Sequence, residues 1–97
     1  MSEAGAVGRL RIDKWLWHAR VLKTRTLAAK LVADGHVRLN GTRTLDPAKP
    51  VKPGDVLTIA LERTVRVLKV VELGARRGPA TEAQGLYEDL SPEPPGR

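Results

Sequence analysis

The apolar residues of this chain first recur at helical spacing near its N-terminus. Intervals of three and one place them on one face of an α-helix. They are Ile12, Trp15, Leu16, Ala19 and Leu22. Asp13 stands at the start of this segment, where its carboxylate could accept an unpaired backbone N–H, so we expect it to be the N-cap. Trp15 should face the core, whereas Trp17 should lie on the opposite side among basic residues.

A second helical repeat follows after a short polar step. Thr24 is a favourable N-cap, and Gly35 is a typical C-terminal stop. The apolar stripe between them consists of Leu27, Ala28, Leu31 and Val32. Arg25 would lie in the first turn, where the positive end of the helix dipole disfavours a cation. Either Arg25 points into water, or a phosphate shares the helix N-terminus with it.

From His36 onward, apolar and polar residues alternate, which is typical of a β-strand. Val37 and Leu39 would face inward, and the pair Asn40-Gly41 favours a hairpin turn. The proline-containing stretch that follows, 42–52, is predicted to be a loop.

The remaining chain predicts two further strands and a short helix. The strands are expected at 56–61 and 64–73, with a Pro-Gly-Asp turn at 53–55 before the first. Thr81 could cap the helix, whose apolar residues are Ala83, Leu86, Tyr87 and Leu90.

This order of elements predicts an α+β fold. Two N-terminal helices would pack on a small antiparallel or mixed β-sheet, with a short C-terminal helix beside them. A chain of 97 residues has room for one modest core. No stretch approaches the roughly 18 apolar residues of a membrane span, and the first residues do not form a secretory signal. We therefore expect a cytoplasmic monomer without a membrane partner.

Charge is distributed unevenly along the chain, whose net charge is +6. Residues 1–52 hold eleven Lys and Arg against four Asp and Glu, whereas residues 53–97 hold six against seven. A clustered basic excess points to a polyanion, usually nucleic acid. The alternative is a solvated basic face that binds nothing.

The residues that enzymes and metal sites use are scarce. There is no cysteine, the serines are Ser2 and Ser91, and the histidines are His18 and His36. The acidic residues form no evident pair for acid–base work, and typical zinc sites need three or four clustered ligands. We therefore expect no catalytic residue, no metal and no cofactor, and a protein that acts by binding.

Basic residues of the two helices and the hairpin are the candidate binding residues. They are Lys14, Arg20, Lys23, Arg25, Lys30, Arg38 and Arg43. Phosphate contacts from such a set would make affinity depend on salt, with little reading of sequence. Because few aromatic side chains accompany them, recognition of folded RNA by shape fits better than a single-strand stacking track.

The stretch RIDKWLWHARVLKTRTLAAKLVADGHVRLNG resembles the S4-type RNA-binding domain, also called the α-L motif. PGDVLTI and RTVRVLKVVELGARRGPATEAQGLYED extend the resemblance to the ribosome-associated heat-shock protein 15 family, over residues 9–90. The resemblance implies two helices against a small twisted sheet. It divides the chain into a flexible arm (1–8), an S4-type domain (9–75), a C-terminal extension with a short helix (76–90) and a disordered tail (91–97).

The resemblance also implies binding of structured ribosomal RNA on the large ribosomal subunit. Members of the family are thought to recognise free large subunits that still carry peptidyl-tRNA, in stress and ribosome quality control. Asp13 would serve structurally, by capping, and Asn40-Gly41 would bring backbone close to RNA. The RNA-binding residues that we expect are Arg11, Lys14, Arg20, Lys23, Thr24, Arg25, Lys30, His36, Arg38, Asn40 and Gly41. The last seven residues, SPEPPGR, include one basic residue. If other members of the family contact RNA through a longer basic C-terminal extension, that contact would be weaker in this chain.

Other functions remain open. The chain could bind RNA or DNA generally, or it could be the RNA-targeting appendage of an RNA-modifying enzyme, although its length counts against a catalytic domain. The role of Trp17 is also open. Its ring could stack on RNA, or it could lie under Leu86, Tyr87 and Leu90 of the C-terminal helix.

Overall fold

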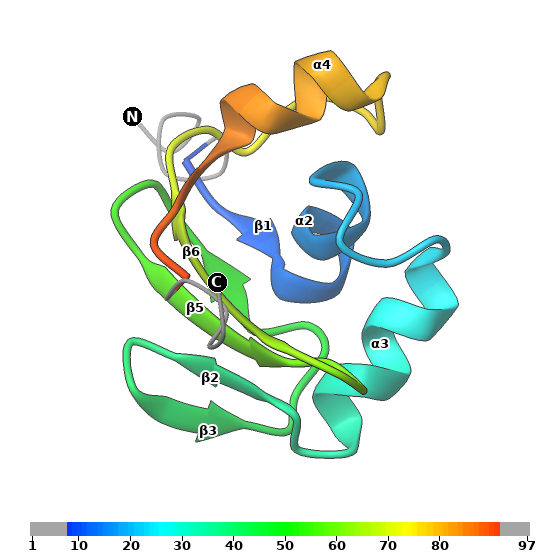
Figure 1. Ribbon diagram of the computed structural model, residues 1–97, viewed down its shortest axis with the longest axis vertical. Coiled ribbons are helices and arrows are strands. Elements are labelled where there is room, and N and C mark those ends of the chain that lie inside the picture. The colour runs from blue at the N-terminus through cyan, green and yellow to red at the C-terminus, as the bar shows by residue number, and fades with distance from the viewer. Residues whose placement is uncertain (1–7, 92–97) are drawn as a thin grey trace.

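Two helices cover one face of a small antiparallel sheet in the computed structural model of the chain, which describes residues 8–91 (Figure 1). The helices are α2 (Ile12–His18) and α3 (Arg25–Ala33). The sheet has the order β3-β2-β5-β6-β7. Its strands are β2 (Val37–Leu39), β3 (Thr42–Thr44), β5 (Val56–Ala60), β6 (Val65–Val70) and β7 (Tyr87–Asp89). A separate two-stranded ribbon joins β1 (Leu10–Arg11) to β4 (Pro50–Val51). The fold is α+β, as predicted.

The expected arm 1–8 and tail 91–97 lie outside the described residues, apart from Gly8 and Ser91. The hydroxyl oxygen of Ser91 accepts a bond from the backbone N–H of Val67 at 2.8 Å, so this residue is tied to β6.

Helix α2 is shorter than its apolar repeat predicted. It ends at His18, and the next bonds run from the N–H of Arg20 to Trp17 O and from the N–H of Val21 to Leu16 O. This is the Schellman pattern, which needs a left-handed residue after the cap. Arg20 takes that conformation, with φ 62°, although no glycine signals it. Helix α3 ends in the same pattern with Gly35 in that position, as expected.

The start of α2 corrects the expectation for Asp13. The N-cap is Arg11, without a side-chain cap bond, and Asp13 lies inside the first turn. Backbone carbonyls do the capping instead, because the N–H groups of Ile12 and Asp13 donate to Lys49 O (2.8 Å) and Pro47 O (3.2 Å). The stretch 42–52 therefore has a structural role. In α3, by contrast, Thr24 is the N-cap and accepts a bond from Leu27 N at 3.0 Å, as predicted.

The hairpin of β2 and β3 turns at Asn40-Gly41, as predicted. Both residues have positive φ, 51° and 86°, which matches the twist that a two-residue hairpin needs. In the register of β2 with β3, Arg38 lies directly opposite Arg43.

The C-terminal extension was only partly predicted. Its helix α4 (Ala80–Ala83) runs into a 3₁₀ turn (Gln84–Leu86), and the chain then becomes strand β7 rather than helix up to Leu90. Pairing with β7 satisfies backbone groups that β6 would otherwise expose at a sheet edge. In Figure 1 helix α4 lies above α2, and the chain then descends to the sheet.

The core lies between the helices and the sheet. It draws on both helices, four strands of the sheet and ribbon, and the extension. Its buried members are Ile12, Trp15, Leu16, Ala19, Ala28, Val32, Val37, Val51, Leu57, Ile59, Leu68, Val70 and Leu86. Trp15 is fully buried, as predicted, and its indole N–H donates to Glu72 O at 2.9 Å. Within residues 8–91, no helix is long and apolar enough to cross a membrane.

Candidate nucleic-acid interface

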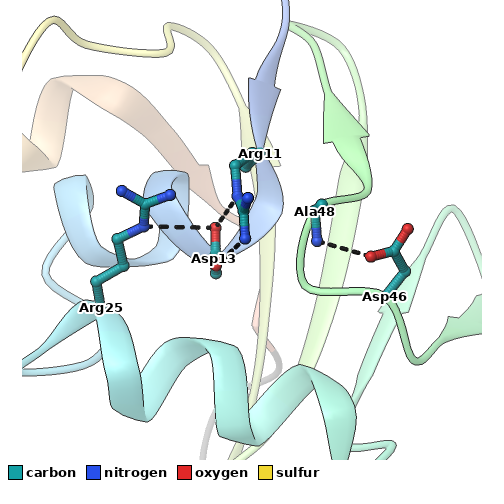
Figure 2. Close-up of polar contacts among 5 residues, drawn as sticks. All are labelled: Arg11, Asp13, Arg25, Asp46 and Ala48. Atoms are coloured by element: carbon teal, nitrogen blue, oxygen red, sulfur yellow. Dashed lines mark hydrogen bonds and ion pairs between the residues drawn. The ribbon is translucent and has the colours of Figure 1, made fainter.

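A buried carboxylate, that of Asp13, holds two arginines from other elements (Figure 2). Arg11 donates from Nε and Nη2 to the two oxygens, at 3.1 and 2.9 Å. The Nε of Arg25, at the start of α3, lies 3.8 Å from Oδ1. The Asp13 side chain is 3% exposed, whereas those of Arg11 and Arg25 are 49% and 42% exposed. We call these three residues the Asp13 clamp.

The Asp13 clamp carries a net positive charge. One carboxylate faces two guanidinium groups, so the cluster keeps a net positive charge that an incoming phosphate can share. The hydrogen bond from Arg11 to Asp13, and then the charge of Asp13, raise the pKa of Arg11 above its ordinary value. Guanidinium groups suit the oxygens of a phosphate backbone, and both side chains are partly exposed.

Two lysines border the clamp along the chain. Lys14 follows Asp13 in α2 and is partly buried, and Lys23 is exposed in the link before Thr24. Neither forms an ion pair with another residue in the described part of the chain. Thr24 is exposed, but its hydroxyl oxygen is engaged in capping α3.

Lys30 and His36 do not belong to the Asp13 clamp and line a separate groove. Lys30 comes five residues after Arg25, which turns it by about 140° around the helix axis. Its Nζ pairs with Asp34 at 3.0 Å. Both Lys30 and His36 line an open groove of about 510 Å³ between α3 and the β5–β6 turn. The other residues of the groove are Leu22, Leu27, Leu31, Asp34, Ala60, Leu61 and Glu62.

The hairpin residues are partly committed to structure. The amide group of Asn40 donates to Asp55 Oδ1 at 3.1 Å, and its carbonyl oxygen accepts from Val56 N at 2.9 Å. Its side chain thus ties the hairpin to the turn before β5. Arg38 donates weakly to Gly41 O, at 3.4 Å, and remains exposed on the outer face.

Asp55 is the acceptor at the centre of this contact. Burial alone would raise its pKa, but bonds from Asn40, from the backbone N–H of Lys52 and from the Lys52 side chain outweigh burial. The pKa of Asp55 is therefore lowered from its ordinary value, and the carboxylate stays charged at neutral pH.

The Arg20 side chain and the backbone carbonyl of Trp17 contact the C-terminal extension. Arg20 donates from Nε to Gly78 O at 2.7 Å, and Arg77 donates from Nε to Trp17 O at 3.1 Å. These two bonds join the end of α2 to the loop before α4. The ring of Tyr87 packs edge-on against Trp15, with centroids 6.5 Å apart. Whether Trp17 stacks on RNA or lies under the extension stays a prediction. Leu90 is largely exposed, and Trp17 is partly exposed.

Sequence reasoning missed three basic residues beside the clamp, namely Arg9, Lys49 and Lys52. They come together because β1 pairs with β4. Strands of two residues are too short to show a period, so no local signal predicts this pairing. Within residues 8–91, no three His, Asp or Glu side chains gather closely enough to hold a metal ion.

Comparison with known proteins gives consistent matches. The S4 domain family matches residues 10–57. Heat shock protein 15 of Escherichia coli is 42% identical over 91 residues, which cover 94% of this chain and 67% of the relative. A protein of Bacillus subtilis called RQC P-site tRNA stabilizing factor is 33% identical over 84 residues, which cover 87% of this chain and 95% of that protein.

A solved structure gives the same result for the fold. The trimeric structure of heat shock protein 15 from Vibrio cholerae matches with a TM-score of 0.79 and 38% identity, over 84% of this chain and 82% of that one. Sequence identity, coverage and fold agree. The chain therefore belongs to the heat shock protein 15 family of S4-domain proteins.

Proposed function

We propose that this protein binds structured ribosomal RNA on the large ribosomal subunit, and that its target is the free subunit that still carries peptidyl-tRNA. The observation that carries the proposal is the Asp13 clamp, which presents two oriented arginines where α2, α3 and β1 meet. The protein acts by binding in the cytoplasm rather than by catalysis.

The binding mechanism is docking by charge and shape. Arg11 and Arg25 would contact phosphates, with Lys14 and Lys23 adding charge beside them. Phosphate contacts position a protein on RNA without reading its bases, so specificity would come from the folded shape of the RNA. The affinity should fall steeply with salt, because each neutralised phosphate releases counterions.

The relatives support the ribosomal part of the proposal. One of them is named for stabilizing a P-site tRNA, and others are named heat shock protein 15. Because the name heat shock protein 15 refers to heat stress, we expect the target subunits to be more abundant in stressed cells.

The first test is sedimentation of the tagged full chain through a sucrose gradient, from lysates made with and without translation stress. We expect it to migrate with free large subunits, more so under stress. A Lys23→Glu/Arg25→Glu variant should stay at the top of the gradient. An Arg63→Glu/Lys69→Glu variant makes the same charge change on β6 and the β5–β6 turn, and should migrate normally. Wild-type protein that never leaves the top of the gradient would contradict the proposal.

A second candidate function is general binding of RNA or DNA. It is favoured by the composition of the clamp, whose groups suit any phosphate backbone. Competition between large-subunit RNA and duplex DNA at matched salt separates the two. Equal competition would favour the general binder.

A further inference from the structure

The β1–β4 ribbon presents cations on its outward face. Leu10 pairs with Val51, and these two residues face the core. Arg11 pairs with Pro50, and both are exposed. Because side chains alternate along a strand, Arg9 shares the outward face with Arg11. The next position of the same register would set Arg9 opposite Lys52, which is also exposed.

A shallow groove continues from the ribbon to the hairpin. One depression of about 230 Å³ includes Arg9 and Lys52 in its lining, and another of about 320 Å³ includes Arg43. Lys49 and Asn40 line both, so the two depressions adjoin each other. The groove therefore connects the ribbon with β3.

Most of these cations lack an intramolecular partner. Lys52 pairs with Asp55 at 3.0 Å. Across the part of the chain that the structure describes, Arg9, Arg43 and Lys49 form no ion pair. Like charges side by side on a ribbon are unfavourable, and a bound anion would relieve them.

The groove is fixed relative to the Asp13 clamp. The carbonyl of Lys49 accepts the N–H of Ile12 at 2.8 Å, immediately after Arg11 in the chain. The stretch that carries Lys49 is stiffened by a bond from Ala48 N to Asp46 Oδ1 at 2.9 Å (Figure 2). The groove and the clamp thus belong to one continuous surface.

We infer that Arg9, Lys49, Lys52 and Arg43 form a second phosphate-binding track, which extends the RNA contact from the helix pair across the ribbon to the hairpin. The inference rests on the proposed RNA binding and names a further part of that interface. The lining holds no aromatic ring for base stacking, but it holds the hydroxyls of Thr42 and Thr44. The partner that fits is the sugar–phosphate backbone of folded RNA, whose 2′-hydroxyls and phosphates both accept hydrogen bonds.

The test is the affinity of the full chain for purified large ribosomal subunits, measured over a range of salt concentrations. We expect an Arg9→Ala/Lys49→Ala variant to raise the dissociation constant by about tenfold or more. It should also lower the slope of log affinity against log salt by about 2, since two phosphate contacts are lost. The matched control is Arg63→Ala/Lys69→Ala, which removes the same charge elsewhere and should keep the wild-type slope. Lys49→Arg should retain binding.

The outcomes separate the inference from the proposed function. If Arg25→Ala weakens binding but Arg9→Ala/Lys49→Ala does not, the second track is refuted and RNA binding stands. If the control variant loses as much affinity as the track variant, the effect is one of net charge and the track is again refuted. If the wild type does not bind subunits at all, the proposed function fails and the inference fails with it.

Discussion

The Nε atom of Arg25, at the start of α3, lies 3.8 Å from Oδ1 of Asp13 in α2. Asp13 is almost fully buried. The same carboxylate takes two hydrogen bonds from Arg11 in β1. One acid thus fixes two arginines from elements on either side of it. Asp13 acts on the candidate interface by positioning cations, although it would repel RNA by its own charge.

This arrangement predicts an unusual response to Asp13→Asn. Removing an acid raises the net charge, which by itself should strengthen RNA binding. We expect the opposite, a loss of about tenfold or about 1.4 kcal/mol, because the two arginines lose their fixed orientation. The measurement is the dissociation constant for large-subunit RNA. Asp34→Asn is the control, since it removes an acid outside the clamp. Equal tightening in both variants would refute the positioning role.

The two faces of α3 predict different effects for its cations. Arg25→Ala should weaken binding of large-subunit RNA by about tenfold, as expected for one charge-assisted bond. Lys30→Ala should have a smaller effect, because Lys30 pairs with Asp34 and lines the apolar groove. Both can be measured by titration at one salt concentration. Equal losses would place the RNA across both faces of the helix.

The extension should contribute to the stability of the whole domain. Leu86 is buried in the core, so Leu86→Ala should lower the free energy of unfolding by about 2–4 kcal/mol. Leu90→Ala is the control, because its side chain is exposed and its loss should cost less than about 0.5 kcal/mol. Urea denaturation followed by tryptophan fluorescence measures both. Similar urea midpoints for the two variants would mean that Leu86 of the extension does not contribute to the stability of the core.

The contact between Asp55 and Asn40 predicts a dependence of stability on pH. The folded pKa of Asp55 lies below its ordinary value, so its contribution is present above the unfolded pKa of about 3.9. That contribution is lost as the pH falls through the lower folded pKa. Asp55→Asn should therefore be less stable than wild type at pH 7, and the difference should shrink toward pH 3. Urea midpoints at both pH values test this, with Glu88→Gln as an exposed control. A constant difference would contradict the prediction.

Local patterns were sufficient for much of the fold and for part of the candidate site. The Thr24 cap, the Gly35 stop and the Asn40-Gly41 turn each depend on the conformations of adjacent residues, and all three are confirmed. The same holds for the burial of Trp15, which its position in the helical repeat predicts. Charge composition indicated a basic first half, and the clamp arginines belong to it.

Contacts between distant residues decided the rest. Asp13 satisfies every local rule for an N-cap, but the capping carbonyls come from Pro47 and Lys49 through the β1–β4 pairing. Tyr87 continues a helical repeat, yet it becomes a strand because the edge of β6 can pair with it. By itself, the sequence determined where the two N-terminal helices begin, where the hairpin turns and where positive charge accumulates, since these depend on neighbours along the chain. Only the tertiary structure decided that Arg9 and Arg11 share a surface with Lys49 and Lys52, because that requires β1 to pair with β4, about 40 residues further along the chain, and neither strand carries a local signal for the pairing.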